Sequence, residues 1–572
     1  MRKIIKHIIA KIFEFRYVGI AVLIFTYMSS GVFAQQVNKN VTGKNGMVVS
    51  ARGEASKIGM EVLMKGGNAF DAAIAVHFAL AVVYPQAGNI GGGGFMLAHT
   101  SKSENVALDF RETAPQKAYR DMYLDKEGNV IQDLSVLGHL AVGVPGSVDG
   151  MAEIHKKYGT LPWYDLVMPA VELAEKGFVI TDLDVIELNK YFSDIKKLNP
   201  KNKYFQKSTP YVTGDTIKQP DLANTLKRIA IEGRDGFYIG PIAELIVKEM
   251  KRGSGIITLE DLKNYKSVWR APITGKFSGH DIITMPPPSS GGVALMQMLY
   301  MLEKLNIKKY KLNSAAYISI VTEVERLAYA DRSHHIGDPD FYKVNVSSLL
   351  DPGYLWQRAK DIEAMKYTPS ANVKPGTTES EQTTHFSITD KFGNAVAITT
   401  TLNSRFGSKV FVSRAGFLLN NEMDDFSAKS GVPNQFGLLG DSANSIQPNK
   451  RMLSSMTPTI VCKNGKIVLV TGSPGGATII TSVLQNILQT IVYKKSLETA
   501  LSNPRFHHQW YPDKIYLEEA WKKYSIEIDA LIKAGYPVEY RDDIGRVDAI
   551  FKKGSLFYGG GDPRGDDMSA GY

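Results

Sequence analysis

The chain has 572 residues, 44% of them hydrophobic and 22% charged, with a formal net charge of +9. This is the composition of a soluble globular enzyme with an ample core, arranged either as about three domains of ~100–200 residues or as one large α/β unit. No run of Lys and Arg with interleaved aromatic residues is present, so nothing predicts nucleic-acid binding. Cys462 is the only cysteine, which excludes a disulfide framework and a cysteine metal site and predicts a small core residue.

The first 34 residues have the pattern of an export signal. A basic leader precedes an apolar run, Tyr17 to Met28, that is about a dozen residues long and too short for the ~20 residues of a spanning helix. Val32-Phe33-Ala34 then has the small-x-small form of a signal-peptidase site. We therefore expect residues 1–34 to be a signal peptide and the mature protein to be periplasmic or secreted. The alternative is an uncleaved membrane anchor.

The first half of the mature chain is predominantly helical in pattern. A helix is predicted from Glu54 to Met64, ending at Gly66-Gly67, and a second, apolar helix over 70–84. Four glycines, 91–94, fit neither helix nor strand well and indicate tight backbone packing or a loop close to a ligand. Residues 150–310 are predicted to be mostly helical, with an interruption at 285–292.

The pattern changes after about residue 365. A polar stretch that ends at Gln382 predicts an exposed connection. Alternating strands are predicted over 384–390 and 394–402, and a hairpin around Asn464-Gly465. A long apolar helix over 473–492 follows. Strands stacked with buried helices on both sides predict a layered α/β sandwich.

Thr383 stands between the polar connection and the first of these strands. A threonine there most often reflects β propensity. Its hydroxyl needs a base to act as a nucleophile, and cleavage of the preceding bond would supply one, because the new α-amine has an unperturbed pKa of ~7.7–8.0. The same hydroxyl could attack the carbonyl of Gln382 first, so one group would serve both maturation and turnover.

Eight motifs show a resemblance to a known family. From Gly46 to the C-terminus the sequence is similar to the γ-glutamyltransferases, also called γ-glutamyltranspeptidases. The motifs are PQAGNIGGGGFML (85–97), DFRETAP (109–115), MPPPSSGG (285–292), QTTHFSITD (382–390), TTLNSRFG (400–407), LLNNEMDDFS (418–427), NKRMLSSMTPT (449–459) and TGSPGG (471–476). The resemblance implies a four-layer αββα sandwich of the N-terminal-nucleophile hydrolase type. It also implies autocleavage into a large chain, 35–382, and a small chain, 383–572, that stay associated.

The resemblance assigns the reaction chemistry to a few positions. It implies that Thr383 is the nucleophile and the new N-terminus, and that Thr401 hydrogen-bonds the nucleophile region and assists maturation. It implies that the backbone N–H groups of Gly475 and Gly476 form the oxyanion hole, where losing one donor typically costs ~10²–10³ in rate. Taken alone, the two glycines also fit a strand-to-helix turn.

The resemblance further implies a site for a free amino-acid head. Arg111 matches the arginine that holds the substrate α-carboxylate, for which a guanidinium fork is suited. Asn403, Glu422 and Asp425 match the acceptors around the substrate α-amino group. Ser454 and Ser455 match the serines that also bind the α-carboxylate. Taken singly, each has a simpler interpretation: a surface ion pair for Arg111, a helix cap for Asp425, a turn for the serines.

Two positions depart from the family pattern. Residues 430–451 resemble its lid loop, but Phe436 replaces a tyrosine that in many bacterial members bonds the site asparagine, which puts lid closure and acceptor preference in doubt. Glu422 stands where some relatives have glutamine. Its extra negative charge should favour the substrate ammonium and disfavour acyl groups without one, such as glutaryl.

Other patterns suggest competing chemistry. The acidic and histidine residues of LAYADRSHHIGDPDF have ligand-rich spacing, but the stretch resembles a family segment with no metal role; they are Asp331, His334, His335, Asp338 and Asp340. We expect no metal and no cofactor, and we expect His507-His508 to be structural. Ser193 to Lys196 fits S-x-x-K without the motifs that accompany it in penicillin-binding enzymes.

The sequence thus predicts a γ-glutamyltransferase with glutathione hydrolase activity. Thr383 would form a γ-glutamyl ester from glutathione or a related compound and pass it to water, an amino acid or a dipeptide. One alternative is a cephalosporin or glutaryl acylase of the same fold. The other is a secreted binding protein that keeps the fold without processing.

Overall fold

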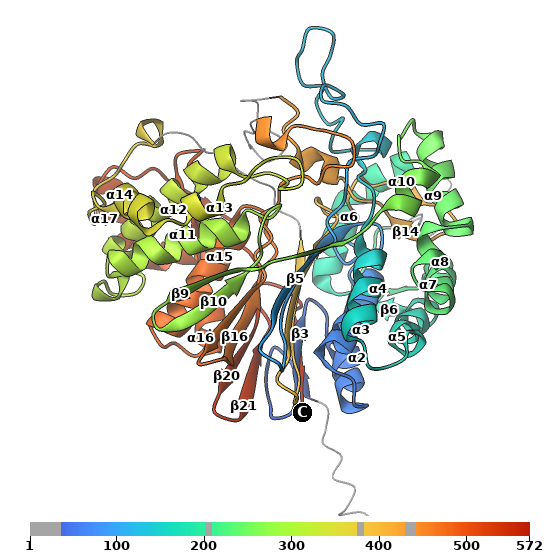
Figure 1. Cartoon of the computed structure of the whole chain (residues 1–572), viewed down its shortest axis with the longest axis horizontal. Coiled ribbons are helices and arrows are strands. Elements are labelled where there is room, and N and C mark those ends of the chain that lie inside the picture. Colours follow the sequence, from blue (N-terminus) through green and yellow to red (C-terminus); the bar gives the residue numbers. More distant parts are fainter. Residues whose placement is uncertain (1–35, 201–206, 208, 374–382, 430–441) are drawn as a thin grey trace, which may run out of the picture.

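Two large β-sheets form the centre of the computed structural model, which describes residues 36–200, 207, 209–373, 383–429 and 442–572 (Figure 1). The first sheet has eight strands in the order β1 (Gln36–Asn38), β22 (Met568–Gly571), β3 (Met47–Ser50), β11 (Thr384–Thr389), β12 (Ala395–Thr401), β4 (Gly93–His99), β5 (Asn105–Asp109) and β8 (Val268–Arg270). The second has seven, in the order β2 (Asn40–Gly43), β21 (Leu556–Gly560), β20 (Asp548–Lys553), β16 (Lys466–Gly472), β15 (Thr459–Lys463), β10 (His280–Thr284) and β9 (Ile273–Phe277). Neighbouring strands in both sheets pair antiparallel.

Helices cover the outer face of each sheet (Figure 1). On the first sheet lie α2 (Gly53–Met64), α3 (Ala69–Val83), α4 (Ser147–Tyr158), α5 (Trp163–Lys176), α6 (Asp182–Leu198), α7 (Pro220–Glu232), α8 (Asp235–Tyr238), α9 (Pro241–Arg252) and α10 (Leu259–Asn264). On the second lie α11 (Gly291–Lys304), α12 (Ala315–His335), α13 (Val346–Leu349), α14 (Pro352–Ala359), α15 (Thr478–Ile487), α16 (Leu497–Ser502) and α17 (Ser525–Lys533). The predicted four-layer αββα sandwich is confirmed.

Smaller sheets lie outside this frame. They are β6 (Phe178–Val179) with β7 (Thr216–Ile217), β13 (Phe411–Val412) with β14 (Phe417–Leu418), and β17 (Phe506–His507) with β18 (Ile515–Glu518) and β19 (Val538–Arg541).

Strand alternation divides the interior into two apolar clusters. Val48 of β3 packs with the helices over the first sheet, whereas its neighbours Met47 and Val49 belong to the cluster that includes the second sheet and its helices. Successive strand residues point to opposite faces, so a strand buried on both sides is apolar throughout rather than alternating. β11 and β12 are both wholly buried at the centre of their sheet, yet β11 alternates, because the polar side chains on one of its faces, His385 and Ser387, are hydrogen-bonded within the interior.

The sequence prediction missed several strands. Residues 150–310, predicted to be helical apart from 285–292, include β8, β9 and β10. The overlooked signal is Ser278-Gly279, where both residues have positive φ and join β9 to β10 as a tight hairpin. The glycine run is also only partly a loop, because Gly93 and Gly94 begin β4.

Segments before and after position 382 alternate across both sheets. Strand β3 lies between β22 and β11, and β10 pairs with β15. One large α/β unit therefore describes the chain better than three domains. Residues 1–34, where we expect a signal peptide, lie outside the described residues, and so does Phe436. Within the described part of the chain, no helix is both long and apolar enough to span a membrane.

Candidate active site

Thr383 lies directly before β11, next to Thr401 at the end of β12. Their strands pair with Thr384 opposite Thr400, which places positions 383 and 401 at the same end of the sheet. Thr383 is 7% exposed and Thr401 2% exposed, and both line one cavity. The hydroxyl oxygen of Thr401 accepts a hydrogen bond of 2.7 Å from the backbone N–H of Asn403.

The glycine run packs directly against the backbone of β12. A Cβ on Gly92 would lie 2.1 Å from the carbonyl oxygen of Thr401, and one on Gly94 would lie 2.3 Å from that of Thr399. The amide of Asn89 donates to the same Thr401 carbonyl at 2.8 Å. The prediction of tight backbone packing is confirmed, and the backbone that the glycines admit is that of β12, which ends at Thr401.

Arg111 lies among the acidic side chains that the sequence assigned to the site. Its guanidinium is 3.0 Å from Oε2 of Glu422 and forms an ion pair with Asp425, and it donates to the carbonyl of Leu453 at 2.9 Å. Glu422 and Asp425 belong to one 3₁₀ turn, in which side chains three residues apart lie on the same side. The carboxylates therefore contact the arginine directly. This arrangement is tighter than the one expected from the sequence, in which the two carboxylates face the arginine across a substrate.

Burial raises the pKa of three neighbouring carboxyl groups. It raises the pKa of Glu112 from its ordinary value of 4.5 to about 8 and that of Glu422 well above its ordinary value, although Arg111 opposes both shifts. The pKa of Asp425 is raised as well, again by burial. Within the described residues, neither carboxyl oxygen of Glu112 has a hydrogen-bond partner, and neither do Oε1 of Glu422 and Oδ1 of Asp425, whereas Oε2 of Glu422 has the ion pair with Arg111. One guanidinium offsets one carboxylate, so the remaining acids of the cluster are harder to ionise than free carboxyl groups.

Ser454 and Ser455 are held by the motif at 285–292. The carbonyl oxygen of Ser454 accepts hydrogen bonds of 2.7 Å from both the backbone N–H and the hydroxyl of Ser290. Arg332 donates to the hydroxyl of Ser290 at 2.7 Å and to that of Ser455 at 3.2 Å. The motif MPPPSSGG therefore fixes the serine pair from behind, and Arg332 joins the two segments.

Three asparagines position the opposite wall. Asn403 has a positive φ of 71° and donates from its side chain to the carbonyl of Asn421 at 2.9 Å. The side chain of Asn420 donates to the carbonyls of Gly91 and Gly143 and accepts from the backbone N–H of Glu422 at 3.0 Å. These bonds connect the glycine run to the turn that carries the acidic residues.

Gly475 and Gly476 precede helix α15. Their φ values, 127° and 56°, lie in the region that favours glycine. The carbonyl of Gly475 accepts from the backbone N–H of Thr478, the first residue of the helix, at 3.0 Å. The glycine backbone is therefore at a helix N-terminus, where N–H groups and the helix dipole favour negative charge.

One small cavity brings together nine of the ten residues that the sequence predicted. Gly475 is the exception. Met456 and Ile479 complete the lining, which otherwise consists of Arg111, Thr383, Thr401, Asn403, Glu422, Asp425, Ser454, Ser455 and Gly476.

Two residues near this cavity were missed from sequence. Glu112 lies within the motif DFRETAP, and a carboxyl directly after the arginine is the signal that could have indicated a shared charge cluster. Arg332 lies in the stretch LAYADRSHHIGDPDF, where only the spacing of the acidic and histidine residues suggested a function.

The metal-like segment is engaged in protein contacts. Asp331 accepts from Gln297 at 3.0 Å and from Tyr354 at 2.7 Å, and Asp340 pairs with Arg270 at 2.8 Å. Across the described ranges, no group of three or more His, Cys, Asp or Glu residues is placed to hold a metal ion.

The remaining sequence candidates are also engaged elsewhere in the fold. His507 is buried, and burial lowers its pKa to about 3. Cys462 is buried in β15, as expected of a core residue. Ser193 and Lys196 lie on α6 and do not line the cavity.

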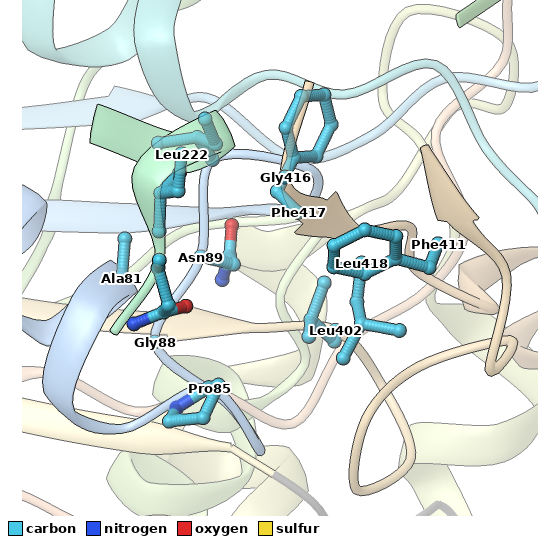
Figure 2. Close-up of a pocket in the computed structure, with 12 residues that line it drawn as sticks. Ala81, Pro85, Gly88, Asn89, Leu222, Leu402, Phe411, Gly416, Phe417 and Leu418 are labelled. Carbon is cyan, nitrogen blue, oxygen red and sulfur yellow. The ribbon is translucent and has the colours of Figure 1, made fainter. Parts of the chain in front are cut away.

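A second cavity is lined in part by Leu402, the residue directly after β12, and its lining contains no charged residue (Figure 2). Figure 2 shows Ala81 and Leu222 on one side of it and Leu402, Phe411 and Leu418 on the other. Asn89, its polar residue nearest to Thr401, already bonds the backbone and Thr400. This cavity carries no group suited to acyl transfer.

Comparison with known proteins agrees with the geometry. The family model of γ-glutamyltranspeptidase matches residues 55–572. The glutathione hydrolase proenzyme of Escherichia coli (strain K12) is 47% identical over 540 residues, which cover 93% of each chain. The crystal structure of Helicobacter pylori γ-glutamyltranspeptidase matches with 47% identity and a TM-score of 0.55, over 56% of this chain and 93% of its own. A cephalosporin acylase from Bacillus halodurans matches with 26% identity and a TM-score of 0.83, over 93% of this chain and 97% of its own.

Proposed function

The chain belongs to the γ-glutamyltranspeptidase family, and we propose that it cuts itself before Thr383 and uses that threonine to attack γ-glutamyl amides. As a member of this family it is an enzyme, a γ-glutamyltransferase with glutathione hydrolase activity. The observation that carries the residue assignment is the cavity in which Thr383 lies with the arginine and carboxylate cluster.

The charge of the cavity fits an amino acid head that carries both an ammonium and a carboxylate. The substrate α-carboxylate would take donors of Arg111, and the ammonium would lie against Oε1 of Glu422 and Oδ1 of Asp425, which have no hydrogen-bond partner among the described residues. One positive and one negative group then enter together, so the net charge of the buried cluster is unchanged. A glutaryl group lacks the ammonium and would add an unbalanced negative charge to a cluster already rich in acids.

Maturation requires one attack by the Thr383 hydroxyl on its own precursor. The oxygen adds to the carbonyl carbon of Gln382, the amide C–N bond breaks, and the nitrogen takes a proton to become the free α-amine. Water then hydrolyses the ester and releases a large chain, 35–382, from a small chain, 383–572. The alternation of the two segments across both sheets supports continued association, since β3, for example, pairs on both sides with strands of the small chain.

Turnover repeats the same chemistry on a γ-glutamyl amide. The α-amine of Thr383 takes the hydroxyl proton, the oxygen attacks the γ-carbonyl, and the leaving amine receives the proton as the C–N bond breaks. Backbone N–H groups of Gly475 and Gly476 would stabilise the oxyanion, and Thr401 would orient the nucleophile. Water, or the amine of an amino acid or dipeptide, would then take the γ-glutamyl group from the ester.

The alternatives fit the site less well. The acylase interpretation draws on the matched cephalosporin acylase structure, at 26% identity. It is disfavoured by Arg111, Glu422 and Asp425, because they suit a charged amino acid head. A binding protein without processing is disfavoured by the placement of Thr383 beside Thr401. We also propose that residues 1–34 direct export to the periplasm or the medium.

A denaturing gel with N-terminal sequencing tests the proposal, with the parent beside Thr383→Ala. We expect two parent bands, the smaller beginning TTHFS, and one band for the variant. A γ-glutamyl anilide and a glutaryl anilide then separate the transferase from the acylase. A parent that stays in one piece would favour the binding protein.

A further inference from the structure

Residues 366–373 lie against the C-terminal part of the chain. Tyr367 donates to Oδ2 of Asp513 at 2.7 Å, and the backbone N–H of Ser370 donates to the same oxygen at 2.7 Å. The hydroxyl of Ser370 donates to the carbonyl of Trp510 at 2.6 Å, and Tyr536 donates to the carbonyl of Lys366 at 3.1 Å. The segment is thus bonded along its whole length.

Trp510 closes the far end of this contact. Its indole N–H lies 3.0 Å from the carbonyl of Ser370 and 3.1 Å from that of Val373. The side chains of Val373 and Trp510 are 7% and 6% exposed and belong to the same apolar cluster. Backbone carbonyls at the end of the segment are therefore satisfied by one side chain within the core.

Arg326 joins the contact from helix α12. It donates to the hydroxyl of Ser370 and forms an ion pair with Asp513, which also accepts from His508 at 3.3 Å. Although burial alone would raise the pKa of Asp513, bonds from His508, Ser370, Tyr367 and Arg326 hold it below its ordinary value. Asp513 is the acceptor on which these groups converge.

The contact lies close in sequence to the proposed cleavage site before Thr383. Nine residues, 374–382, separate Val373 from Thr383 in the sequence. We propose that Trp510, Asp513 and Tyr536 form a docking site for the segment 366–373, which keeps the end of the large chain bound to the small chain after the cut. The proposal rests on the proposed function, because only that cut turns an intramolecular contact into one between two chains.

The docking site also shortens the separation in sequence between the last anchored residue and the scissile bond. With Val373 fixed, Thr383 lies 10 positions after the last anchor; without it, the nearest anchor within the large chain is the backbone N–H of Thr368, which donates to Glu323 at 3.3 Å, and the separation becomes 15 positions. The free energy of closing a chain segment grows as (3/2)RT ln n, so the closure probability falls as the 3/2 power of its length, and losing the contact should lower the local concentration of the bond about twofold. We therefore expect processing of variants to slow by about that factor.

A dye at position 372 tests the docking site directly. Asn372 is exposed and Cys462 is buried, so a thiol-reactive dye on an Asn372→Cys enzyme labels the new cysteine. Fluorescence anisotropy of the processed enzyme is then compared with that of Trp510→Phe, which keeps a ring but removes the N–H, and of Asp513→Asn. Asp529→Asn is the matched control, an exposed acid on α17 of the same chain. We expect anisotropy to fall to about half in the two variants, because a released chain end moves within nanoseconds, and to stay unchanged in the control.

The two proposals fail in different ways. A parent that a denaturing gel shows in one piece would contradict the proposed function. A processed parent whose anisotropy is the same in Trp510→Phe and Asp513→Asn, with circular dichroism confirming that both are folded, would overturn the docking site and leave the proposed function intact.

Discussion

Two buried arginines, Arg111 and Arg326, each lie among acidic side chains, and the acids differ in how they are bonded. Around Arg326, Asp513 accepts from several donors and its pKa is lowered. Around Arg111, the oxygens of Glu112 have no hydrogen-bond partner in the described chain and Glu422 has only its ion pair with the arginine, and burial raises the pKa values of both acids.

The difference is the one expected between a cluster that holds the fold together and the cluster that we propose binds substrate. A buried carboxylate with all its bonds made by the protein has nothing left to offer a ligand. Buried acids without donors cost free energy and are retained where a donor arrives from outside. The cluster around Arg111 opens on the cavity that contains Thr383, whereas the cluster around Arg326 holds chain segments together.

The largest effect is expected from Arg111→Lys. Lysine keeps the charge but loses the planar fork that pairs with a carboxylate, and the acids around it lose part of their compensation. We expect kcat/KM for a γ-glutamyl anilide to fall by about 10²–10³, as for loss of a buried charged partner. Arg252→Lys, at a partly exposed arginine on α9, is the control. A fall of less than about tenfold would mean that Arg111 does not hold the substrate.

Next in size is the opposite pH dependence of stability in the two clusters. Because the pKa of Asp513 is lowered in the folded protein, this carboxylate adds to the free energy of unfolding above its unfolded-state pKa. The contribution is lost as the pH falls through the folded-state pKa. Asp513→Asn should therefore lower stability by about 2 kcal/mol at pH 7, through the lost charged hydrogen bonds, and the difference should shrink in acid.

Glu112→Gln should act in the other direction. The folded carboxyl holds its proton up to about pH 8, whereas the unfolded one releases it near 4.5, so the parent loses stability as pH rises between these values. As pH rises, the free energy of unfolding of Glu112→Gln should fall less steeply than that of the parent, by about 1 kcal/mol per pH unit at most. Urea unfolding followed by circular dichroism at pH 5 and pH 8 measures both variants. Parallel pH profiles for the parent and Glu112→Gln would show that Glu112 is ionised.

The sequence was sufficient for local features of the fold but not for its long-range pairing. Alternation and turn residues predicted β11 and β12 and the hairpin of β15 and β16, because those signals are local. That β11 lies between β12 and β3, more than 300 positions earlier, follows from sheet packing that no local pattern encodes. The short edge strands β8 and β9 were missed for the related reason that they carry little alternation.

The candidate site was predicted through family resemblance, not through spacing. Arg111 and Glu422 are far apart in sequence, and only the resemblance related them before the fold brought them to 3.0 Å. Glu112 adds a buried carboxyl group with a raised pKa, and Arg332 supports Ser455 through a hydrogen bond. No sequence motif indicated either contribution. Residues that act by supporting the cavity residues can be identified only when their burial and hydrogen-bond partners are known.

The smallest effect is expected from Glu422→Gln, which tests how the cluster around Arg111 selects its ligand. The amide keeps the size of the side chain but cannot become the carboxylate that offsets a substrate ammonium. We expect the ratio of kcat/KM for a γ-glutamyl anilide to that for a glutaryl anilide to fall about five- to tenfold, an energy of about 1 kcal/mol. Glu303→Gln, on the exposed side of α11, should leave the ratio unchanged. If the ratio for Glu422→Gln also stays constant, charge at this position does not set the preference, and recognition of the ammonium rests on Asp425 and Asn403.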